Sequence, residues 1–373
     1  MVGGGQLARM THQAAIGLGQ SLRILATDPD DGAAMVAADV HLGQPDDLDA
    51  LRRFAKGCDV ITFDHEHVPA EHIRALVEAG ETVHPSAAAL LHAQDKQAMR
   101  QRLTEIGIPV PRWQPVRDVA DVVGFAAEAG WPVVLKAVTG GYDGRGVWIA
   151  EDAEQAAGPL ARGGRFLVEE RLRLRRELAV QLARSPFGQV AVYPVVETVQ
   201  RDGVCTEVLA PAPGLAPDTA IEIQELAIRI ASELDVVGLL AVELFDTEHG
   251  IMVNELAMRP HNSGHWSIEG ARTSQFEQHL RAVLDYPLGA CELTAPAVVM
   301  ANVLAAAQSP PQPLDERLHH MFAAEPSVRV HLYGKRPRPG RKIGHVTALG
   351  ADLAEVRARA GRAARLLREG VTG

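Results

Sequence analysis

Apolar residues in the first part of the chain form short runs, with Ala- and Leu-rich helical patterns between them. The runs at 23–28, 59–63 and 82–85 have the length of buried strands. This alternation is typical of a parallel sheet with crossover helices. The expected first strand is nearly missing, because the glycines at 3–5 come after only two residues. We therefore expect the true start of the protein several residues upstream.

Beyond residue 95 the pattern changes twice more. A helix predicted over 97–106 ends at a glycine with prolines behind it, and a second unit at about 113–182 contains a strand at 133–137. A long helix is predicted over 221–234. A Pro-rich segment and a short strand near 328–332 mark a smaller C-terminal region. The sequence predicts an α/β protein of three domains, at 1–94, 95–290 and 291–373.

Two apolar runs within 239–256 flank a Gly-containing turn at 246–250 and predict a β-hairpin. A turn centred there places Glu243 opposite Val253. Because side chains alternate between faces, Glu255 lies on the same face, a diagonal neighbour of Glu243 at about 7–8 Å or less. Two carboxylates on an apolar face repel each other and lose water unless a cation lies between them.

Mg²⁺ suits such a carboxylate pair, because it prefers oxygen ligands and brings phosphates with it. The alternative is an exposed hairpin face that carries two solvated glutamates. The polar residues just downstream, an Arg, two His, an Asn and a Ser within 259–265, favour the cation site.

Composition limits the classes of function. The chain has 373 residues, of which 47% are hydrophobic and 23% charged, as in a soluble globular protein. No apolar run has the roughly 18–20 residues that span a bilayer, and the N-terminus has no secretion signal. Cys58, Cys205 and Cys291 are far apart, which fits a reducing, cytoplasmic location. A net charge of −10 and 4% aromatic residues argue against a nucleic-acid partner.

The glycines at 3–5 belong to the pattern G-x-G-x-x-A, which ends at Ala8, and Asp28 follows the next predicted strand. An acidic residue there binds ribose in dinucleotide-binding proteins, so a nicotinamide-dependent oxidoreductase is a rival hypothesis. Such loops also bind other phosphates through main-chain N–H groups.

A second Gly-rich loop, at 139–146, follows Lys136, which interrupts an apolar strand. A lysine at a buried strand position needs an anionic partner, and glycines let the main chain approach phosphates closely. Together with Arg145 this pattern favours a triphosphate site. The alternative is a surface turn with Lys136 at a sheet edge.

Three weaker signals remain. The segment 166–172, followed by Glu177, could offer main-chain groups to an adenine and a carboxylate to ribose. The basic segment 333–342 could hold a phosphate ester. At 65–67, His-Glu-His residues adjacent on a strand cannot all face one metal ion, so only Glu66 is expected to contact a ligand. The G-x-S-x-G motif of serine hydrolases is absent from the sequence.

Taken in order, these motifs resemble the ATP-grasp superfamily, and more closely its N5-carboxyaminoimidazole ribonucleotide synthase family. The segments that carry the resemblance are 3–7, 64–69, 84–86, 140–146, 254–257, 259, 261–266 and 338–345. The resemblance implies an ATP-grasp fold with a Rossmann-like N-terminal domain, a mobile lid at about 113–182 and a small β-rich C-terminal domain. It also implies a homodimer.

The resemblance further implies a ligase of purine biosynthesis. ATP would phosphorylate bicarbonate to carboxyphosphate, which would carboxylate 5-aminoimidazole ribonucleotide either directly or as released CO2, and leave ADP and phosphate. The implied cofactors are ATP and Mg²⁺, with Mn²⁺ as a substitute. Phosphoryl transfer of this kind needs positioning and charge neutralisation rather than a covalent nucleophile.

The resemblance also assigns roles to residues. ATP contacts are implied for Lys96, Lys136, Gly141, Tyr142, Asp143, Gly144, Arg145, Gly146, Glu169, Glu170, Arg171, Leu172, Glu177, Gln200, Asn254 and Glu255. Substrate contacts are implied for Tyr142, Arg145, Arg259, His261, Asn262, Ser263, Lys335, Arg341 and Lys342. Arg259, His261, Asp143 and Arg145 are expected to be catalytic, and Glu243 and Glu255 to bind the metal.

Several positions depart from the family pattern. Lys96 replaces a usual Arg, Val147 a common Gln, Gln200 a His, Met258 a Pro and Ala8 a Gly. These changes affect expected nucleotide contacts and leave the metal and acceptor residues intact. Two alternatives stay open, a related ligase such as a formate-using glycinamide ribonucleotide enzyme, and a nucleotide-binding regulatory protein without catalysis. Trp266, after the segment 261–265, favours the carboxylating family over the formate-using one.

Overall fold

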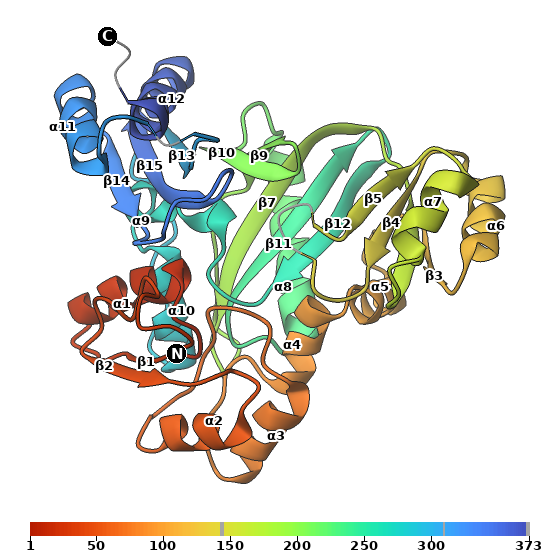
Figure 1. The fold of residues 1–373 in the computed structure, drawn as a ribbon, viewed down its shortest axis with the longest axis horizontal. Coiled ribbons are helices and arrows are strands. Elements are labelled where there is room, and N and C mark those ends of the chain that lie inside the picture. Colours follow the sequence, from red (N-terminus) through yellow and green to blue (C-terminus); the bar gives the residue numbers. More distant parts are fainter. Residues whose placement is uncertain (142–144, 309, 371–373) are drawn as a thin grey trace.

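The computed structural model describes residues 1–141, 145–308 and 310–370. Figure 1 shows an N-terminal unit, a small sheet with two helices, and a long curved sheet that runs through the centre of the protein. None of the helices in the described ranges is both long and apolar enough to cross a membrane.

The N-terminal unit is an α/β arrangement with very little regular strand. Its parallel strands are β1 (Arg23–Ala26) and β2 (Asp39–Leu42), and its helices are α1 (Gln6–Gly17), α2 (Leu48–Ala55), α3 (Ala70–Glu78) and α4 (Ala87–Gln94). The strand predicted at 23–28 is confirmed. Those predicted at 59–63 and 82–85 are present only as parallel single-residue bridges, from Phe63 to Val2 and from Ile61 to Val83. Each segment pairs over too few residues to form a ladder.

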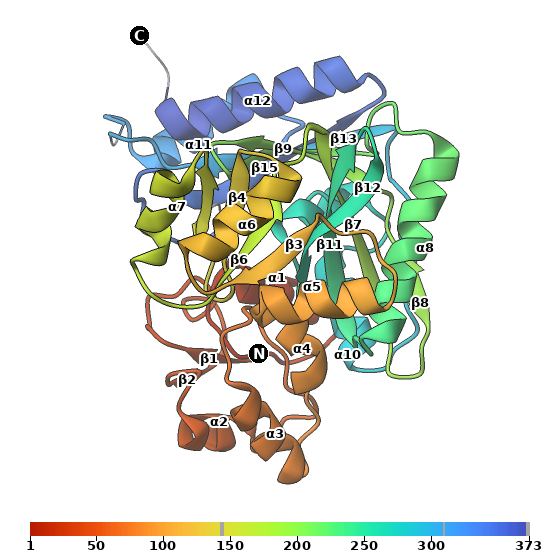
Figure 2. The ribbon, with the colours of Figure 1, turned by 90° about the vertical axis from the view of Figure 1, so that its right-hand side faces the viewer.

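The small sheet has the order β3-β6-β4-β5. Its strands are β3 (Trp113–Val116), β4 (Val133–Ala137), β5 (Val147–Ala150) and β6 (Phe166–Glu170), and α6 (Val119–Ala129) and α7 (Ala153–Leu160) pack on it. Figure 2 shows both helices beside this sheet, with α5 (Lys96–Glu105) below it. The strand predicted at 133–137 is confirmed. The predicted unit ran to residue 182, whereas β7, which begins at Leu174, lies in the large sheet.

The large sheet is antiparallel, in the order β12-β11-β7-β9-β10-β13-β15-β14, with β8 paired to β7. Its strands are β7 (Leu174–Arg184), β8 (Val190–Val192), β9 (Val196–Arg201), β10 (Val204–Ala210), β11 (Gly238–Thr247), β12 (Gly250–Ala257), β13 (Ala297–Leu304), β14 (Arg329–Leu332) and β15 (Lys342–Gly350). The sheet continues across the predicted domain boundary at 291, because β13 pairs with β10. That boundary stays a prediction.

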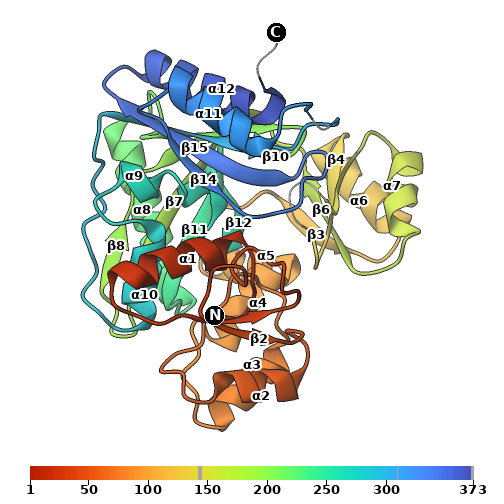
Figure 3. The same cartoon turned by 60° about the vertical axis from the view of Figure 1, so that its left-hand side comes forward.

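Helices from the second half of the chain pack on this sheet or beside it. They are α8 (Pro217–Glu233), the 3-10 turn η1 (Asn262–Gly264), α9 (Ser267–Gly270), α10 (Gln275–Val283), α11 (Leu314–Ala324) and α12 (Leu353–Glu369). Figure 3 shows α1 of the N-terminal unit lying against α10. Phe276 at the start of α10 packs there with Leu7 and Met10 of α1.

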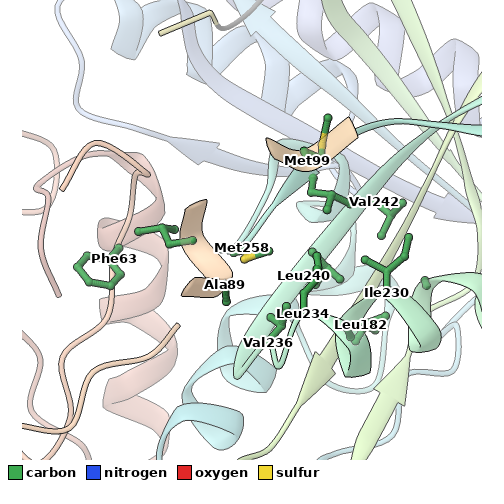
Figure 4. Close-up of a cluster of buried hydrophobic side chains, with 14 of the residues drawn as sticks. Phe63, Ala89, Met99, Leu182, Ile230, Leu234, Val236, Leu240, Val242 and Met258 are labelled. Atoms are coloured by element: carbon green, nitrogen blue, oxygen red, sulfur yellow. The ribbon is translucent and has the colours of Figure 1, made fainter. Parts of the chain in front are cut away.

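One apolar core joins the N-terminal unit to the large sheet. Figure 4 shows side chains from both parts in it, among them Phe63, Ala89, Met99, Leu182, Leu240 and Met258. All of these are at most 1% exposed. The β11–β12 hairpin is therefore held on a packed support, with little freedom to move relative to the N-terminal unit.

The predicted hairpin is confirmed, but its predicted register is wrong. Glu243 pairs with Glu255 and Leu244 with Val253, so Asn254 is the extra residue of a β-bulge. A bulge places two residues of one strand against one of its partner, and the apolar pattern does not reveal it. As a result the two carboxylates are directly opposite each other rather than diagonal.

Candidate active site

A cavity of about 2120 Å³ opens between the three parts of the fold. Its walls come from the first Gly-rich loop, the segment 64–69, strands β4 and β5, the end of β6, the β11–β12 hairpin and the segment 259–263. Most of the residues predicted from the sequence line it.

The two carboxylates of the hairpin form an acidic wall of the cavity. Burial, together with the nearby charges of Glu255 and Glu177, raises the pKa of Glu243 to about 7. Lys96 Nζ lies 2.6 Å from Glu255 Oε1, and His261 Nε2 lies 3.6 Å from Glu243 Oε1. Burial is the largest cause of this raised pKa, and the two neighbouring carboxylates add a repulsion to it.

This donor set suits a divalent cation. Within the described ranges no three His, Cys, Asp or Glu side chains are grouped so as to hold a metal alone. Mg²⁺ characteristically takes only one or two protein carboxylates and completes its shell with phosphate oxygens and water. Glu243 and Glu255 match that requirement. A cation would relieve the repulsion between Glu243 and the carboxylates of Glu255 and Glu177.

A buried ion triad lies behind this wall. Glu169 accepts from Arg100 Nε at 2.6 Å, and its other oxygen lies 2.7 Å from Lys136 Nζ. Lys136 Nζ also donates to Asn254 Oδ1 at 3.0 Å. Burial alone would raise the pKa of Glu169, but the two cations outweigh it and lower this pKa to about 2. The triad holds Lys136 against the hairpin bulge.

The triad supplies the anionic partner that the sequence required for Lys136. Glu169, which is expected beside adenine, lines the cavity, and its carboxylate is also part of the triad. Arg100 was missed, since a single arginine in a polar helix gives no signal of burial. Glu170, Arg171, Leu172, Glu177 and Gln200 line the cavity, as do exposed apolar residues that the sequence did not single out, Trp131, Ile149 and Leu174.

The second Gly-rich loop begins where β4 ends. Tyr142, Asp143 and Gly144 lie outside the described residues. A Cβ at Gly141 would come 2.8 Å from the carbonyl oxygen of Arg145, and Gly146 has a φ of +77°. Only glycine meets both conditions without strain, so these positions allow the main chain to fold back tightly beside Lys136.

Arg259 is held from the N-terminal unit. Its Nε donates to Glu66 Oε2 at 2.8 Å. Gln94 fixes the main chain around Glu66 by donating to the carbonyl oxygens of Glu66 at 2.6 Å and Val68 at 2.8 Å. Glu66 was expected to contact a ligand. It lines the cavity itself and also pairs with Arg259, which lines the same cavity.

His261 follows Arg259 and lines the cavity beside Glu243. Burial lowers its pKa to about 3, and the positive charges of Arg259 and Lys342 add to this effect. The imidazole is therefore neutral at physiological pH and offers the cavity a hydrogen-bonding group rather than a positive charge.

Asn262 and Ser263 line the cavity, but their polar groups bind within the protein. The amides of Asn262 and Asn302 form two reciprocal hydrogen bonds, of 2.9 and 2.8 Å. Ser263 Oγ accepts from Gln181 Nε2 at 2.7 Å and lies 2.8 Å from His261 Nδ1. Both residues support the wall of the site.

The basic C-terminal segment divides into two parts. Lys342, at the start of β15, lines the cavity. Lys335 donates to Gln6 and lies over the Tyr333 ring, and Arg341 donates to the carbonyl oxygen of Arg336 at 3.2 Å. Neither Lys335 nor Arg341 is part of the cavity wall, so the structure brings together only one of the three predicted cations with the hairpin.

The first Gly-rich loop already holds an anion of the chain itself. Gly5 N donates to Asp64 Oδ2 at 2.7 Å, and a Cβ at Gly3 would lie 1.6 Å from Asp64 Oδ1. The buried Asp64 carboxylate therefore lies at the N-terminus of α1, where a dinucleotide would place its pyrophosphate. Asp28 accepts from Asp30 N at 2.9 Å in an exposed turn. These contacts argue against the oxidoreductase hypothesis.

Comparison with known families defines the class. Residues 1–94 match the ribonucleotide synthetase preATP-grasp domain, 101–276 the ATP-grasp domain and 298–359 the phosphoribosylaminoimidazole carboxylase C-terminal domain. The fold and the cavity are those of an ATP-grasp ligase.

The particular family follows from full-length relatives. The chain is 60% identical over 375 residues to N5-carboxyaminoimidazole ribonucleotide synthase of Mycobacterium tuberculosis, across 99% of this chain and 87% of the relative. It belongs to the N5-carboxyaminoimidazole ribonucleotide synthase family.

Solved structures agree. The synthetase from Thermus thermophilus has a TM-score of 0.88 and 37% identity, covering 99% of both chains. The synthase from Aspergillus clavatus in complex with ADP and 5-aminoimidazole ribonucleotide has a TM-score of 0.88 and 30% identity, covering 98% of both chains.

Proposed function

We propose that this protein uses ATP to carboxylate 5-aminoimidazole ribonucleotide with bicarbonate. A bicarbonate oxygen attacks the γ-phosphorus of ATP, which releases ADP and forms carboxyphosphate. The exocyclic amine of the ribonucleotide then bonds to the carboxyl carbon, and phosphate leaves. The observation that supports this best is the opposed Glu243–Glu255 pair, with Lys136 behind it and Arg259 and His261 beside it.

Each wall of the cavity has a part in this proposal. Glu243 and Glu255 would hold Mg²⁺, which neutralises phosphate charge when bound. Lys136 would face the ATP phosphates, and the buried triad would fix the position of its ammonium group. Arg259, held by Glu66, would stabilise the anionic carboxyphosphate, and the neutral His261 would donate a hydrogen bond to it. Lys342 adds a positive charge on the acceptor side.

The remaining assignments extend this proposal. ATP would also contact Lys96, Glu170, Arg171, Leu172, Glu177, Gln200 and Asn254, and Lys335 and Arg341 would reach the ribonucleotide phosphate only if their segment moves. We further propose a homodimer, a cytoplasmic location and the three domains predicted above. Sedimentation of the purified protein tests the dimer.

Measurement of ADP release tests the reaction. We expect release to require bicarbonate and 5-aminoimidazole ribonucleotide together, with the carboxylated ribonucleotide formed in equal amount. Formate with glycinamide ribonucleotide is the control for the related ligase. ADP release that ignores bicarbonate, or that formate with glycinamide ribonucleotide supports equally, would contradict the proposal.

A further inference from the structure

The two ring nitrogens of His261 have different surroundings. Nε2 faces Glu243 Oε1 across 3.6 Å at the cavity. Nδ1 lies 2.8 Å from Ser263 Oγ and 3.4 Å from the main-chain N of Ser263. A main-chain N–H can only donate, so Nδ1 is an acceptor and the ring proton lies on Nε2. The ring therefore presents an N–H group to the cavity.

Gln181 controls the hydroxyl that contacts this ring. It lies in the middle of β7, 1% exposed, and its Nε2 donates to Ser263 Oγ at 2.7 Å. Because Ser263 Oγ accepts this bond, its own proton is available to His261 Nδ1. Gln181 and Ser263 together fix both the rotation of the ring and the nitrogen that carries the proton.

A second buried glutamine fixes the main chain of the same residue. Gln275 Oε1 accepts from His261 N at 2.9 Å, and its Nε2 donates to His261 O at 2.8 Å and approaches His265 Nδ1 at 2.9 Å. Its side chain is inaccessible to solvent. A Cβ at Gly264 would lie 2.4 Å from Gln275 Oε1, so the turn 261–265 packs directly against this amide.

We propose that Gln275, and Gln181 acting through Ser263, are positioning residues for His261 in the reaction proposed above. Gln275 fixes the main chain of His261, and the Gln181–Ser263 pair fixes its ring so that the Nε2 proton faces the reacting groups. A hydrogen-bond donor stabilises a transition state only if it is already aimed at the place where charge develops. Both glutamines act on His261 from inside the protein.

The chain contains a matched control for Gln275. Gln278 lies in the same helix, is equally buried, and binds the main chain of Gly289 in the same way, by accepting from N at 2.8 Å and donating to O at 2.6 Å. Its amide binds the loop near residue 289 rather than the turn 261–265. Gln275→Leu and Gln278→Leu therefore remove similar buried hydrogen bonds, and only the first removes those of His261.

Steady-state kinetics of the purified variants, with their unfolding midpoints, test the inference. We expect Gln275→Leu and Ser263→Ala to lower kcat by about tenfold or more, with KM for ATP and for the ribonucleotide within about twofold of wild type. Gln278→Leu should lower the unfolding midpoint as much as Gln275→Leu and keep kcat within about twofold. Gln275→Glu keeps the acceptor for His261 N, so its kcat should lie between those of wild type and Gln275→Leu. If Gln275→Leu does not fold, Gln275→Glu takes its place in the test.

Three results would overturn the inference. The first is a wild-type kcat in Gln275→Leu or Gln275→Glu, and the second is a loss of kcat in Gln278→Leu equal to that in Gln275→Leu. The third is a Ser263→Ala defect confined to KM for the ribonucleotide, which would make Ser263 a substrate contact. Failure of the proposed function is distinct, because the wild-type protein itself would then show no bicarbonate- and ribonucleotide-dependent ADP release.

Discussion

Neutralising Glu243 should stabilise the ligand-free protein at alkaline pH. The pKa of Glu243 is raised from 4.5 to about 7 by burial and by the carboxylates of Glu255 and Glu177. A group with a raised folded-state pKa stabilises the fold below its unfolded pKa of 4.5, and this stability is lost as pH rises through about 7. Glu243→Gln removes the ionisation and hence the loss.

The magnitude follows from the same pKa values. Between pH 5 and pH 8, ionisation of Glu243 costs about 2 to 3 kcal/mol of unfolding free energy. Its side chain is 28% exposed, which favours the lower end of this range. Glu243→Gln should therefore gain about 2 kcal/mol relative to wild type on going from pH 5 to pH 8.

Denaturant unfolding with a metal chelator present, at both pH values, measures this gain. Glu222→Gln on the exposed face of α8 is the control and should show no pH-dependent gain. Mg²⁺ with ADP should raise the stability of the wild type at pH 8 and have little effect on Glu243→Gln, because the variant lacks a metal carboxylate. A variant that is less stable than wild type at pH 8, or whose gain does not change with pH, would refute the reasoning.

Two other changes test buried ionisable groups. Glu169→Gln should lose about 3–5 kcal/mol of unfolding free energy, since it leaves Arg100 and Lys136 buried without their counter-charge; a loss below about 1 kcal/mol in denaturant unfolding would contradict the triad. The pKa of His279 is lowered to about 3, chiefly by burial, so the unfolded chain binds a proton that the folded chain does not, and stability falls as pH drops from 6.5 towards 3. His279→Gln should reduce that slope by about 1.4 kcal/mol per pH unit, and an unchanged slope would show that His279 is protonated in the folded state.

The local pattern of apolar residues along the chain determined many of the helices and strands of this protein. The strand at 133–137, the helix after residue 95 and the two arms of the hairpin follow from the spacing of apolar residues, because each element buries one face or one stripe. The Gly-rich loop after Lys136 was evident because glycine is needed where the main chain folds back tightly. The order of these motifs was enough to indicate the family.

The tertiary structure decided how these parts meet. Period-two alternation placed Glu243 and Glu255 on one face, but the bulge at Asn254 set them opposite each other. Asn254 accepts a hydrogen bond from Lys136, which lies more than a hundred residues away in the chain. The Glu66–Arg259 pair joins residues 193 positions apart, and no local pattern carries that information.

The tertiary structure also decided which charged groups bind other parts of the protein. Asp64 occupies the first Gly-rich loop, and Glu169 neutralises two buried cations. The sequence shows which residues can bear charge or donate a hydrogen bond. Only packing decides which of them bind one another and which remain for a ligand, because that choice depends on distances and burial between segments far apart in the chain.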